Sequence, residues 1–216
     1  MGDAMKVVRS VALFLLALSL AGCASLQISS EFSSGRMALL TGDNQTALAY
    51  FQSTAEKDPN YAYGSAYRQN IWSYLGRVEY ATGRLPQAQQ SLEKALVAKE
   101  QADLARLYLG LTLARSGDRQ RGLKEIETGM RGIHDWIEWV TQAHRFSFGH
   151  FWDPRREIRQ AIQTDLTMIS SREFDWQKLI AEGEWLGKQM EEEIDRARQD
   201  ETRQLSRDND GDQGRP

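Results

Sequence analysis

The feature that most constrains this chain of 216 residues is an internal repeat with a spacing of 34 residues. The segment YLGRVEYATGRLPQAQQSLEKAL, from Tyr74, aligns with YLGLTLARSGDRQRGLKEIETGM, from Tyr108. The aligned pairs include Leu75 with Leu109, Gly76 with Gly110, Gly83 with Gly117, Ala88 with Gly122, Leu92 with Ile126 and Ala95 with Gly129. An earlier copy, GRMALLTGDNQTALAYFQSTAEKDP, begins at Gly35, and extra residues around NYAYGSAY separate it from the second copy. Such a chain is expected to fold by stacking one repeated unit on the next.

These residues resemble the tetratricopeptide repeat family, whose unit is a 34-residue pair of antiparallel helices. The second copy carries the matching residues Trp72, Leu75, Gly76, Gly83, Ala88 and Ala95. The first copy lacks the tryptophan, and the third has Gly122 and Gly129 where alanine is usual. Because a glycine inside a helix costs up to about 1 kcal/mol, the third unit is expected to be looser or to end early. The resemblance implies an all-α fold, a helical-hairpin solenoid of about three repeats over residues 32–133.

The resemblance also implies a concave groove lined by the first helix of each hairpin. Projecting the family's groove positions onto this chain gives a candidate partner-binding set of Arg36, Asn70, Ser73, Arg77, Tyr80 and Arg115, with Leu107 and Leu111 beside them. Arginine binds carboxylates in a two-pronged way, so these side chains suit a partner's acidic groups or extended backbone. Two alternatives stay open: the set forms solvated helix faces, or Leu107 and Leu111 pack on the C-terminal region.

The first 23 residues carry a second pattern, which ends on the one cysteine of the chain. A short start with Lys6 and Arg9 precedes an apolar run from Val11 to about Ala21, too short for a membrane span of roughly 20 residues. This order is typical of a secretory signal peptide. The segment LAGC, ending at Cys23, resembles the lipobox of bacterial lipoproteins. That resemblance implies cleavage after residue 22, lipid on the Cys23 sulfur and acylation of the new amino terminus; a chance cysteine behind an ordinary signal peptide is the alternative.

The lipoprotein resemblance divides the chain and places it in the cell envelope. Residues 1–22 are the expected signal peptide, and residues 23–31 are a small, polar, lipidated tether. Ala24, rather than aspartate, follows the cysteine and by resemblance favours the outer membrane, with the protein facing the periplasm. Two or more acyl chains hold a protein on a membrane stably.

After Ile133 the repeat disappears and aromatic side chains become frequent. Residues 134–199 are expected to form capping helices over the last repeat, since the ends of a solenoid need covering. Within them, Asp153 is the expected N-cap and Pro154 the first residue of a helix. The final helix is expected to end near Gln199, and residues 200–216 to form a disordered polar tail.

Several function classes find little support in the sequence. His134, His144 and His150 lack the i, i+4 spacing of a zinc helix, so no metal site is expected. No nucleophile motif or phosphate-cradling loop is present, and we expect neither an enzyme nor a bound cofactor. The net charge of −3 gives no basic face for nucleic acid.

The sequence therefore predicts a lipid-anchored envelope adaptor that binds other envelope proteins or peptides, as similar lipoproteins do in envelope assembly, pilus biogenesis or the control of cell-wall enzymes. The alternative is a periplasmic carrier whose small ligand binds among the aromatic residues from Trp136 to Trp152. The oligomeric state stays open.

Overall fold

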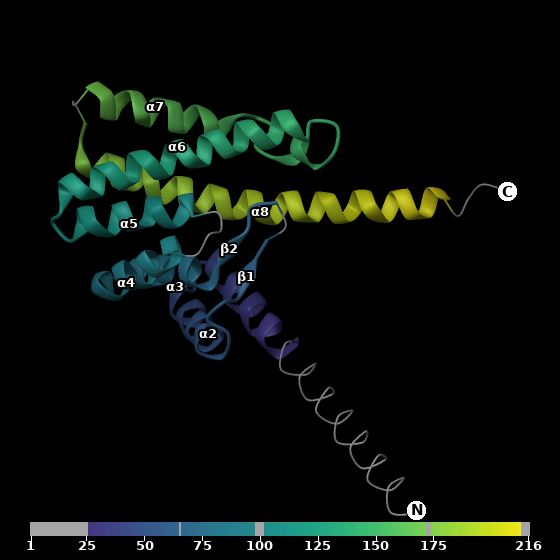
Figure 1. The fold of residues 1–216 in the computed structure, drawn as a ribbon, viewed down its shortest axis with the longest axis horizontal. Coiled ribbons are helices and arrows are strands. Elements are labelled where there is room, and N and C mark those ends of the chain that lie inside the picture. Colours follow the sequence, from purple (N-terminus) through teal and green to yellow (C-terminus); the bar gives the residue numbers. More distant parts are fainter. Residues whose placement is uncertain (1–25, 65, 98–101, 172–173, 213–216) are drawn as a thin grey trace, which may run out of the picture.

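The structure is a computed structural model that describes residues 26–64, 66–97, 102–171 and 174–212. Almost all of the described chain is helical, which confirms the expected all-α helical-hairpin fold (Figure 1). A helix over residues 26–40 is followed by α2 (Asn44–Lys57), β1 (Ala62–Tyr63), β2 (Gln69–Asn70), α3 (Ile71–Ala81), α4 (Leu85–Val97), α5 (Asp103–Arg115), α6 (Arg119–Ala143), the 3₁₀ turn η1 (Phe148–Phe151), α7 (Glu157–Ser171) and α8 (Trp176–Asp212).

Three helical hairpins share one turn geometry. They pair residues 26–40 with α2, α3 with α4, and α5 with α6. The turn glycines Gly42, Gly83 and Gly117 have φ values of 81°, 76° and 101°, a left-handed conformation that glycine adopts without a side-chain clash. At each turn the residue after the glycine donates its backbone N–H to the carbonyl five residues earlier, at 2.8, 2.8 and 2.9 Å. This is the Schellman ending, and its repetition explains the glycine spacing of the sequence.

The glycines of the third hairpin bring its two helices into close contact. A Cβ on Gly129 would lie 2.6 Å from Leu107 N, and one on Gly122 would lie 2.8 Å from Ala114 N. The clashing atoms belong to the backbone of α5, so no side-chain rotation relieves them. The expectation that this unit ends early is wrong: α6 runs unbroken for 25 residues and crosses the expected boundary at Ile133. Packing against α5 requires the glycines that helix propensity alone disfavours.

The extra residues between the first two copies form a small antiparallel ribbon. Ala62 pairs with Asn70 and Tyr63 with Gln69. The ring of Tyr63 packs on Phe32 of the first helix, with 5.0 Å between ring centroids. The insertion therefore fills space at the end of the first hairpin and leads directly into α3.

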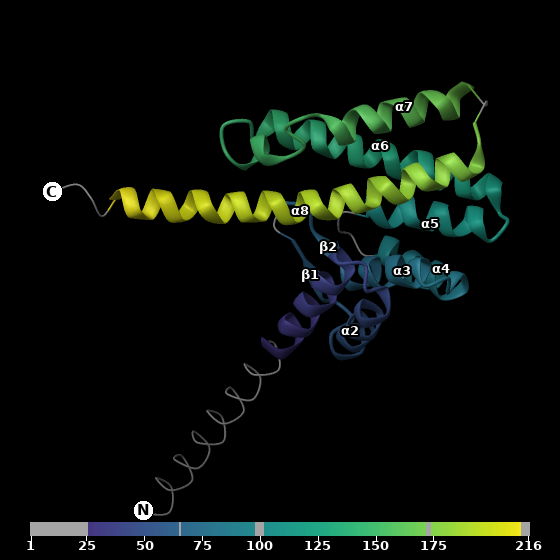
Figure 2. The same ribbon diagram turned by 180° about the vertical axis from the view of Figure 1, so that it is seen from behind.

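The chain after α6 folds back across the hairpins. α7 packs on α6, while α8 packs on α5 and α7 and passes over one face of the hairpin stack (Figure 2). Asp153 has a φ of 42°, and its carboxylate accepts from the backbone N–H groups of Ile158 and Arg159. Helix α7 nevertheless begins at Glu157, so Pro154 is not its first residue as expected; Asp153 caps the helix from a turn in front of it.

Both ends of the described chain are more helical than expected. Residues 26–31, expected in a tether, belong to the first helix, where Glu31 bonds Ser53 and Lys57 of α2. At the other end α8 passes Gln199 and continues to Asp212, over part of the expected polar tail. Side-chain pairs three or four residues apart, such as Arg203 with Asp200 at 3.3 Å, support this extension.

Candidate functional site

Helix α8 occupies much of the face where the sequence places a binding groove. The first helix, α3 and α5 contribute one helix from each hairpin to this face, and α8 supplies acidic side chains against it. Gly183 of α8 faces Leu111, and Gly187 faces the ring of Tyr108. These two glycines, four residues apart on one side of α8, allow it to approach α5 closely.

A buried group of three charges joins α8 to two hairpins. Arg36 Nε donates to Glu191 Oε1 at 2.7 Å, and Arg77 Nη1 donates to Glu191 Oε2 at 2.9 Å. The side chains of Glu191 and Arg77 are each 3% exposed. Burial by itself raises the pKa of Glu191, but the two guanidinium groups lower it below its usual value, so the carboxylate stays charged.

Asn70 and Ser73, two residues of the predicted set, make their hydrogen bonds within the fold. The Asn70 side chain accepts from Ser73 N at 3.0 Å and caps α3, and its amide donates to Ala95 O at 3.0 Å. The Ser73 hydroxyl donates to Gln69 Oε1 at 3.1 Å. Both residues are buried, so they fix the start of α3 rather than face solvent.

Tyr80 and Arg115 meet α8 at the other end of the groove. The Tyr80 hydroxyl donates to Glu184 Oε1 at 2.5 Å, and Arg115 Nη1 lies 3.7 Å from the same carboxylate oxygen. Burial, followed by the hydrogen bond to Glu184, raises the pKa of Tyr80. Arg115 also lies over the Tyr80 ring, 4.8 Å from its centroid, and its side chain is 40% exposed.

The structure thus brings the predicted residues to one face of the hairpins. Five of the six, all except Arg115, are buried. Sequence reasoning missed Glu184, Glu191 and Asp195, acidic residues of α8 that contact this set. The paired glycines Gly183 and Gly187 were the available signal, since small residues at i and i+4 mark a helix face that another element approaches closely.

A pocket of about 510 Å³ remains at the Arg115 end of this groove. The first turn, α3, α5 and α8 all contribute to it. Its lining comprises Leu39, Leu40, Thr41, Gly42, Asn44, Arg77, Tyr80, Ala81, Tyr108, Arg115, Glu184, Lys188, Glu191 and Glu192. The groove is therefore covered by α8 at Glu191 and open at Arg115 and Lys188.

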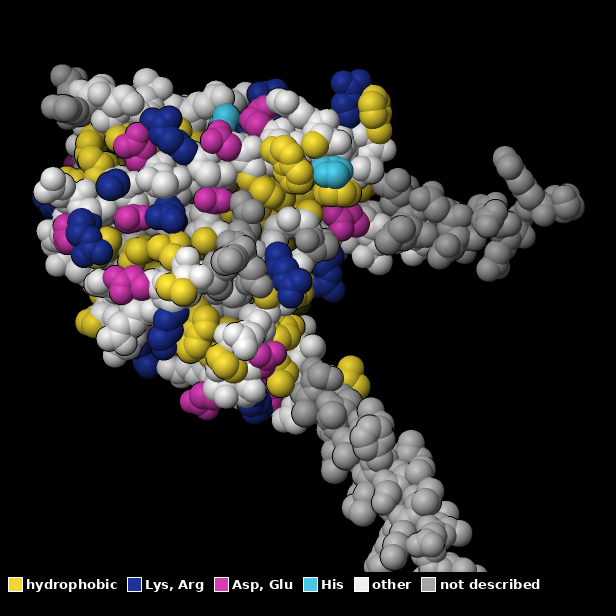
Figure 3. Space-filling model, in the orientation of Figure 1, with side chains coloured by type: hydrophobic (Ala, Val, Ile, Leu, Met, Phe, Trp, Pro, Cys, Tyr) yellow, Lys and Arg dark blue, Asp and Glu magenta, His cyan; other side chains and the backbone are white. Residues whose placement is uncertain are grey.

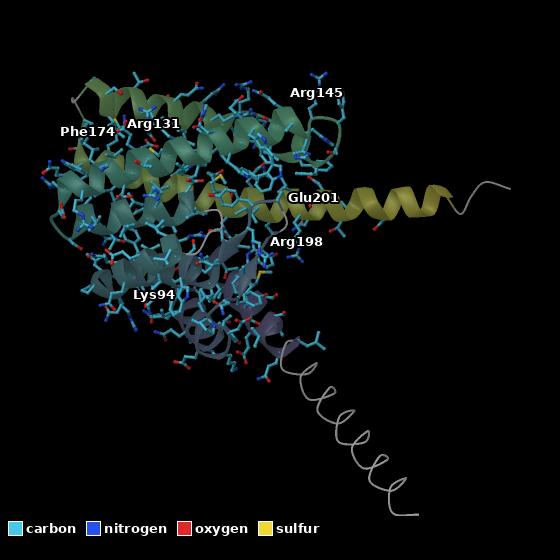
Figure 4. The ribbon with its side chains drawn as sticks, in the orientation of Figure 1. Lys94, Arg131, Arg145, Phe174, Arg198 and Glu201 are labelled. Atoms are coloured by element: carbon cyan, nitrogen blue, oxygen red, sulfur yellow. The ribbon has the colours of Figure 1, made fainter. Side chains whose placement is uncertain are left out.

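The aromatic C-terminal region divides into buried and exposed parts. Trp136 and Trp152 are buried, with ring centroids 4.6 Å apart in an edge-to-face arrangement. Trp139 and Phe146 are 55% and 86% exposed. Figure 3 shows hydrophobic side chains gathered near the turn after α6, and Figure 4 places Arg145 in that turn. In the same turn, the rings of His144 and Phe148 are stacked, with centroids 4.4 Å apart.

The remaining predicted sites are placed as follows. Cys23 and residues 1–22 lie outside the described residues. His134 lies beside Asp135 and Gln163, and within the described ranges no three histidine, cysteine or acidic side chains gather as a metal ion would need. None of the helices in the described part combines the length and apolar character needed to cross a bilayer.

No protein-family model matches this chain, and no curated protein matches it in sequence.

Proposed function

We propose that this protein is a lipid-anchored adaptor of the cell envelope, in which the stacked hairpins present a binding surface to another protein. The observation that carries the proposal is the open end of the groove, where Arg115 and Lys188 stand at the edge of a pocket on a rigid helical face. Their side chains are 40% and 69% exposed, so a partner's acidic groups can reach them without disturbing the core.

The anchor belongs to the same proposal. With cleavage before Cys23, two residues, Ala24 and Ser25, separate the lipidated cysteine from Leu26, the first described residue. So short a connection would hold the hairpins close to the membrane surface, where the partners of an envelope adaptor are found.

The long final helix offers a second surface for the same role. Ala197 is the last residue of α8 that is buried among those whose exposure the structure describes, and the helix continues to Asp212. Figure 4 labels Arg198 and Glu201 where α8 leaves the fold, and the Arg198 guanidinium lies over the Tyr63 ring of the β-ribbon, 5.3 Å from its centroid. A charged helix that extends beyond its own fold is accessible to a protein partner.

A crosslinking pull-down from native membranes tests the proposal. Wild type is compared with Arg115→Glu and Lys188→Glu, which invert charges at the open end, and with Arg121→Glu on α6 as control, because Arg121 is 59% exposed and lies outside the pocket lining. Arg77 is unsuitable for this test because it is buried. Mass spectrometry of the same sample reports the lipid on Cys23.

We expect a partner that is lost in the two pocket variants and retained in the control. A partner retained in all variants would contradict the assignment of the groove as the binding surface. The adaptor function itself would be contradicted by the absence of any reproducible partner.

A further inference from the structure

The turn after α6 exposes aromatic side chains that the rest of the fold does not cover. Trp139, near the end of α6, is 55% exposed, and Phe146 is 86% exposed. The Trp139 ring lies edge-to-face with the His144 ring, with 5.2 Å between centroids, so the aromatic surface continues from the helix into the turn. We call residues 139–148 the aromatic turn. Contiguous exposed apolar groups of this kind mark contact sites for a protein or a membrane.

The backbone of the aromatic turn is fixed by contacts with α6. The His144 carbonyl accepts from the backbone N–H of Gly149 at 3.0 Å. A Cβ on Gly149 would clash with the carbonyl oxygen of Val140, so the chain passes too close to α6 for a side chain at this position. Phe148 packs against the core, whereas Phe146, two residues earlier, is left in solvent. The exposure of Phe146 therefore follows from the shape of an ordered turn.

The aromatic turn carries positive charge. No aspartate or glutamate occurs between Trp139 and Trp152, although the chain has 30 acidic residues. The guanidinium of Arg145 lies over the Phe146 ring, 4.3 Å from its centroid, and makes no ion pair with the residues that the structure describes. Figure 4 shows Arg145 directed away from the helices. An exposed ring and an unpaired cation thus lie together at the outer end of the turn.

Carboxylates of the helices packed against the turn have partners within the fold. Glu138 of α6 lies 3.0 Å from Arg159 and 3.3 Å from Arg156. The side chain of Glu193 of α8 is 4% exposed and lies 2.6 Å from Arg196. Neither carboxylate is free to offset the positive charge of the aromatic turn.

A membrane surface with anionic lipid matches both properties of the turn. Its headgroups supply the negative charge that Arg145 lacks within the fold, and tryptophan and phenylalanine rings are favoured at the boundary between headgroups and acyl chains. Figure 1 shows the turn as a loop at one end of the α6–α7 pair. A loop that ends in one exposed ring can enter a bilayer directly, whereas a protein partner would have to supply a pocket for that ring.

We propose that the aromatic turn is a membrane-contact site, which inserts Phe146 and Trp139 into the surface of an anionic bilayer while Arg145 binds the headgroups. This inference rests on the proposed function, in which the anchor holds the chain at a membrane. It adds an orientation, because an anchor and a second contact together fix the direction in which the groove faces.

Quenching of tryptophan fluorescence by brominated lipid tests this contact. The full-length chain, isolated from membranes with its own anchor, is reconstituted in vesicles of phosphatidylcholine and phosphatidylglycerol whose acyl chains carry bromine close to the headgroups. We expect quenching in wild type that Trp139→Phe removes, since this substitution takes away the reporter and keeps an aromatic ring. Trp185→Phe is the matched control, on a residue of α8 that is 38% exposed, and is expected to leave the quenching unchanged.

Two further pairs of variants separate the ring from the charge. Phe146→Ser is expected to lower the quenching by about half or more, because the inserted ring is lost. Val97→Ser, on α4 at a side chain that is 83% exposed, is its control and is expected to have no effect. Arg145→Glu is expected to lower the quenching in vesicles that contain phosphatidylglycerol, whereas Arg131→Glu, at an exposed position of α6, is not.

Quenching that persists in Trp139→Phe would overturn the proposal, as would equal quenching in Phe146→Ser and Val97→Ser. Flotation of the same vesicles reports the anchor separately: a chain that floats without quenching keeps its anchor and lacks the second contact. In the absence of quenching, a crosslinked partner or a self-association that Phe146→Ser abolishes would assign the turn to a protein surface and overturn the membrane proposal. The substituted side chains are exposed, so the variants are expected to fold, and circular dichroism checks that they do.

Discussion

Arg77 of α3 and Glu191 of α8 are 114 residues apart in sequence, yet Arg77 Nη1 lies 2.9 Å from Glu191 Oε2, and both side chains are 3% exposed. With Arg36, they connect α8 to two of the three hairpins. Long-range ion pairs of this kind stabilise one specific arrangement only when each charge keeps its partner, because an unpaired buried charge is costly.

Glu191→Gln is expected to destabilise the fold by about 3–5 kcal/mol, because it leaves the buried guanidinium of Arg77 without a carboxylate and leaves Arg36 only its longer contact with Asp195. Urea unfolding followed by circular dichroism measures the change. Glu192→Gln is the control: its carboxylate belongs to the exposed pair with Lys188, and a loss of under about 0.5 kcal/mol is expected. Equal effects of the two substitutions would contradict the importance of the buried group.

Gly129→Ala is expected to destabilise the protein by about 1–3 kcal/mol, although alanine is the better helix former. The added methyl group would lie 2.6 Å from Leu107 N, so α5 and α6 must separate. Thr128→Ala, at the neighbouring exposed position, is expected to change stability little. Thermal unfolding compares the two, and a stabilised Gly129→Ala would contradict the close packing of these helices.

Asp165 makes stability depend on pH. Burial, with the nearby charge of Glu182, raises its pKa to about 6, while Lys178 acts in the opposite direction. Since the folded pKa lies above the unfolded value, the folded state binds more protons between about pH 4 and 6. The contribution of Asp165 to stability is therefore fully present below about pH 4 and is lost as the pH rises through 6.

Asp165→Asn is accordingly expected to increase stability at pH 7, by about 1–2 kcal/mol after allowance for solvent screening, and to reduce the change in stability between pH 4 and 7. Urea unfolding at several pH values tests this. Glu182→Gln is expected to act in the same direction with a smaller effect, because it removes the nearby negative charge. A wild-type profile that rises from pH 4 to 7, with no difference in Asp165→Asn, would contradict the assignment.

Two N-caps of different burial provide the last prediction. Asn70→Ala removes the cap of α3 and also leaves the buried Ala95 carbonyl without its donor, so a loss of about 2–3 kcal/mol is expected. Asp43→Ala removes the exposed cap of α2, which accepts from Thr46 N, and a smaller loss is expected. Chemical denaturation measures the loss in the free energy of unfolding for each variant. A larger loss for Asp43→Ala than for Asn70→Ala would contradict the prediction.

The local parts of this fold follow directly from the sequence. The turns at Gly42, Gly83 and Gly117 recur with the repeat, because a left-handed residue at a helix end favours glycine wherever it occurs. Local preference did not predict the role of the glycines inside α6. Helix propensity predicted weakness at Gly122 and Gly129, but their contacts with α5 depend on which helix lies opposite, and propensity contains no information about that.

Sequence analysis predicted the part of the candidate site that lies on the hairpins and missed the part that α8 contributes. Repeat geometry placed Arg36, Arg77 and Arg115 on one face, since residues in equivalent positions of stacked hairpins share a face. The expected capping helices included much of the chain that forms α8. That expectation did not show that Glu191 reaches Arg36 and Arg77, because the need to cover a solenoid does not state which residues meet. The sequence determined the hairpins and their turns through local backbone preferences, whereas the covering of the groove by α8 was decided by contacts between residues distant in the sequence, such as Arg36 and Glu191, which are 155 positions apart.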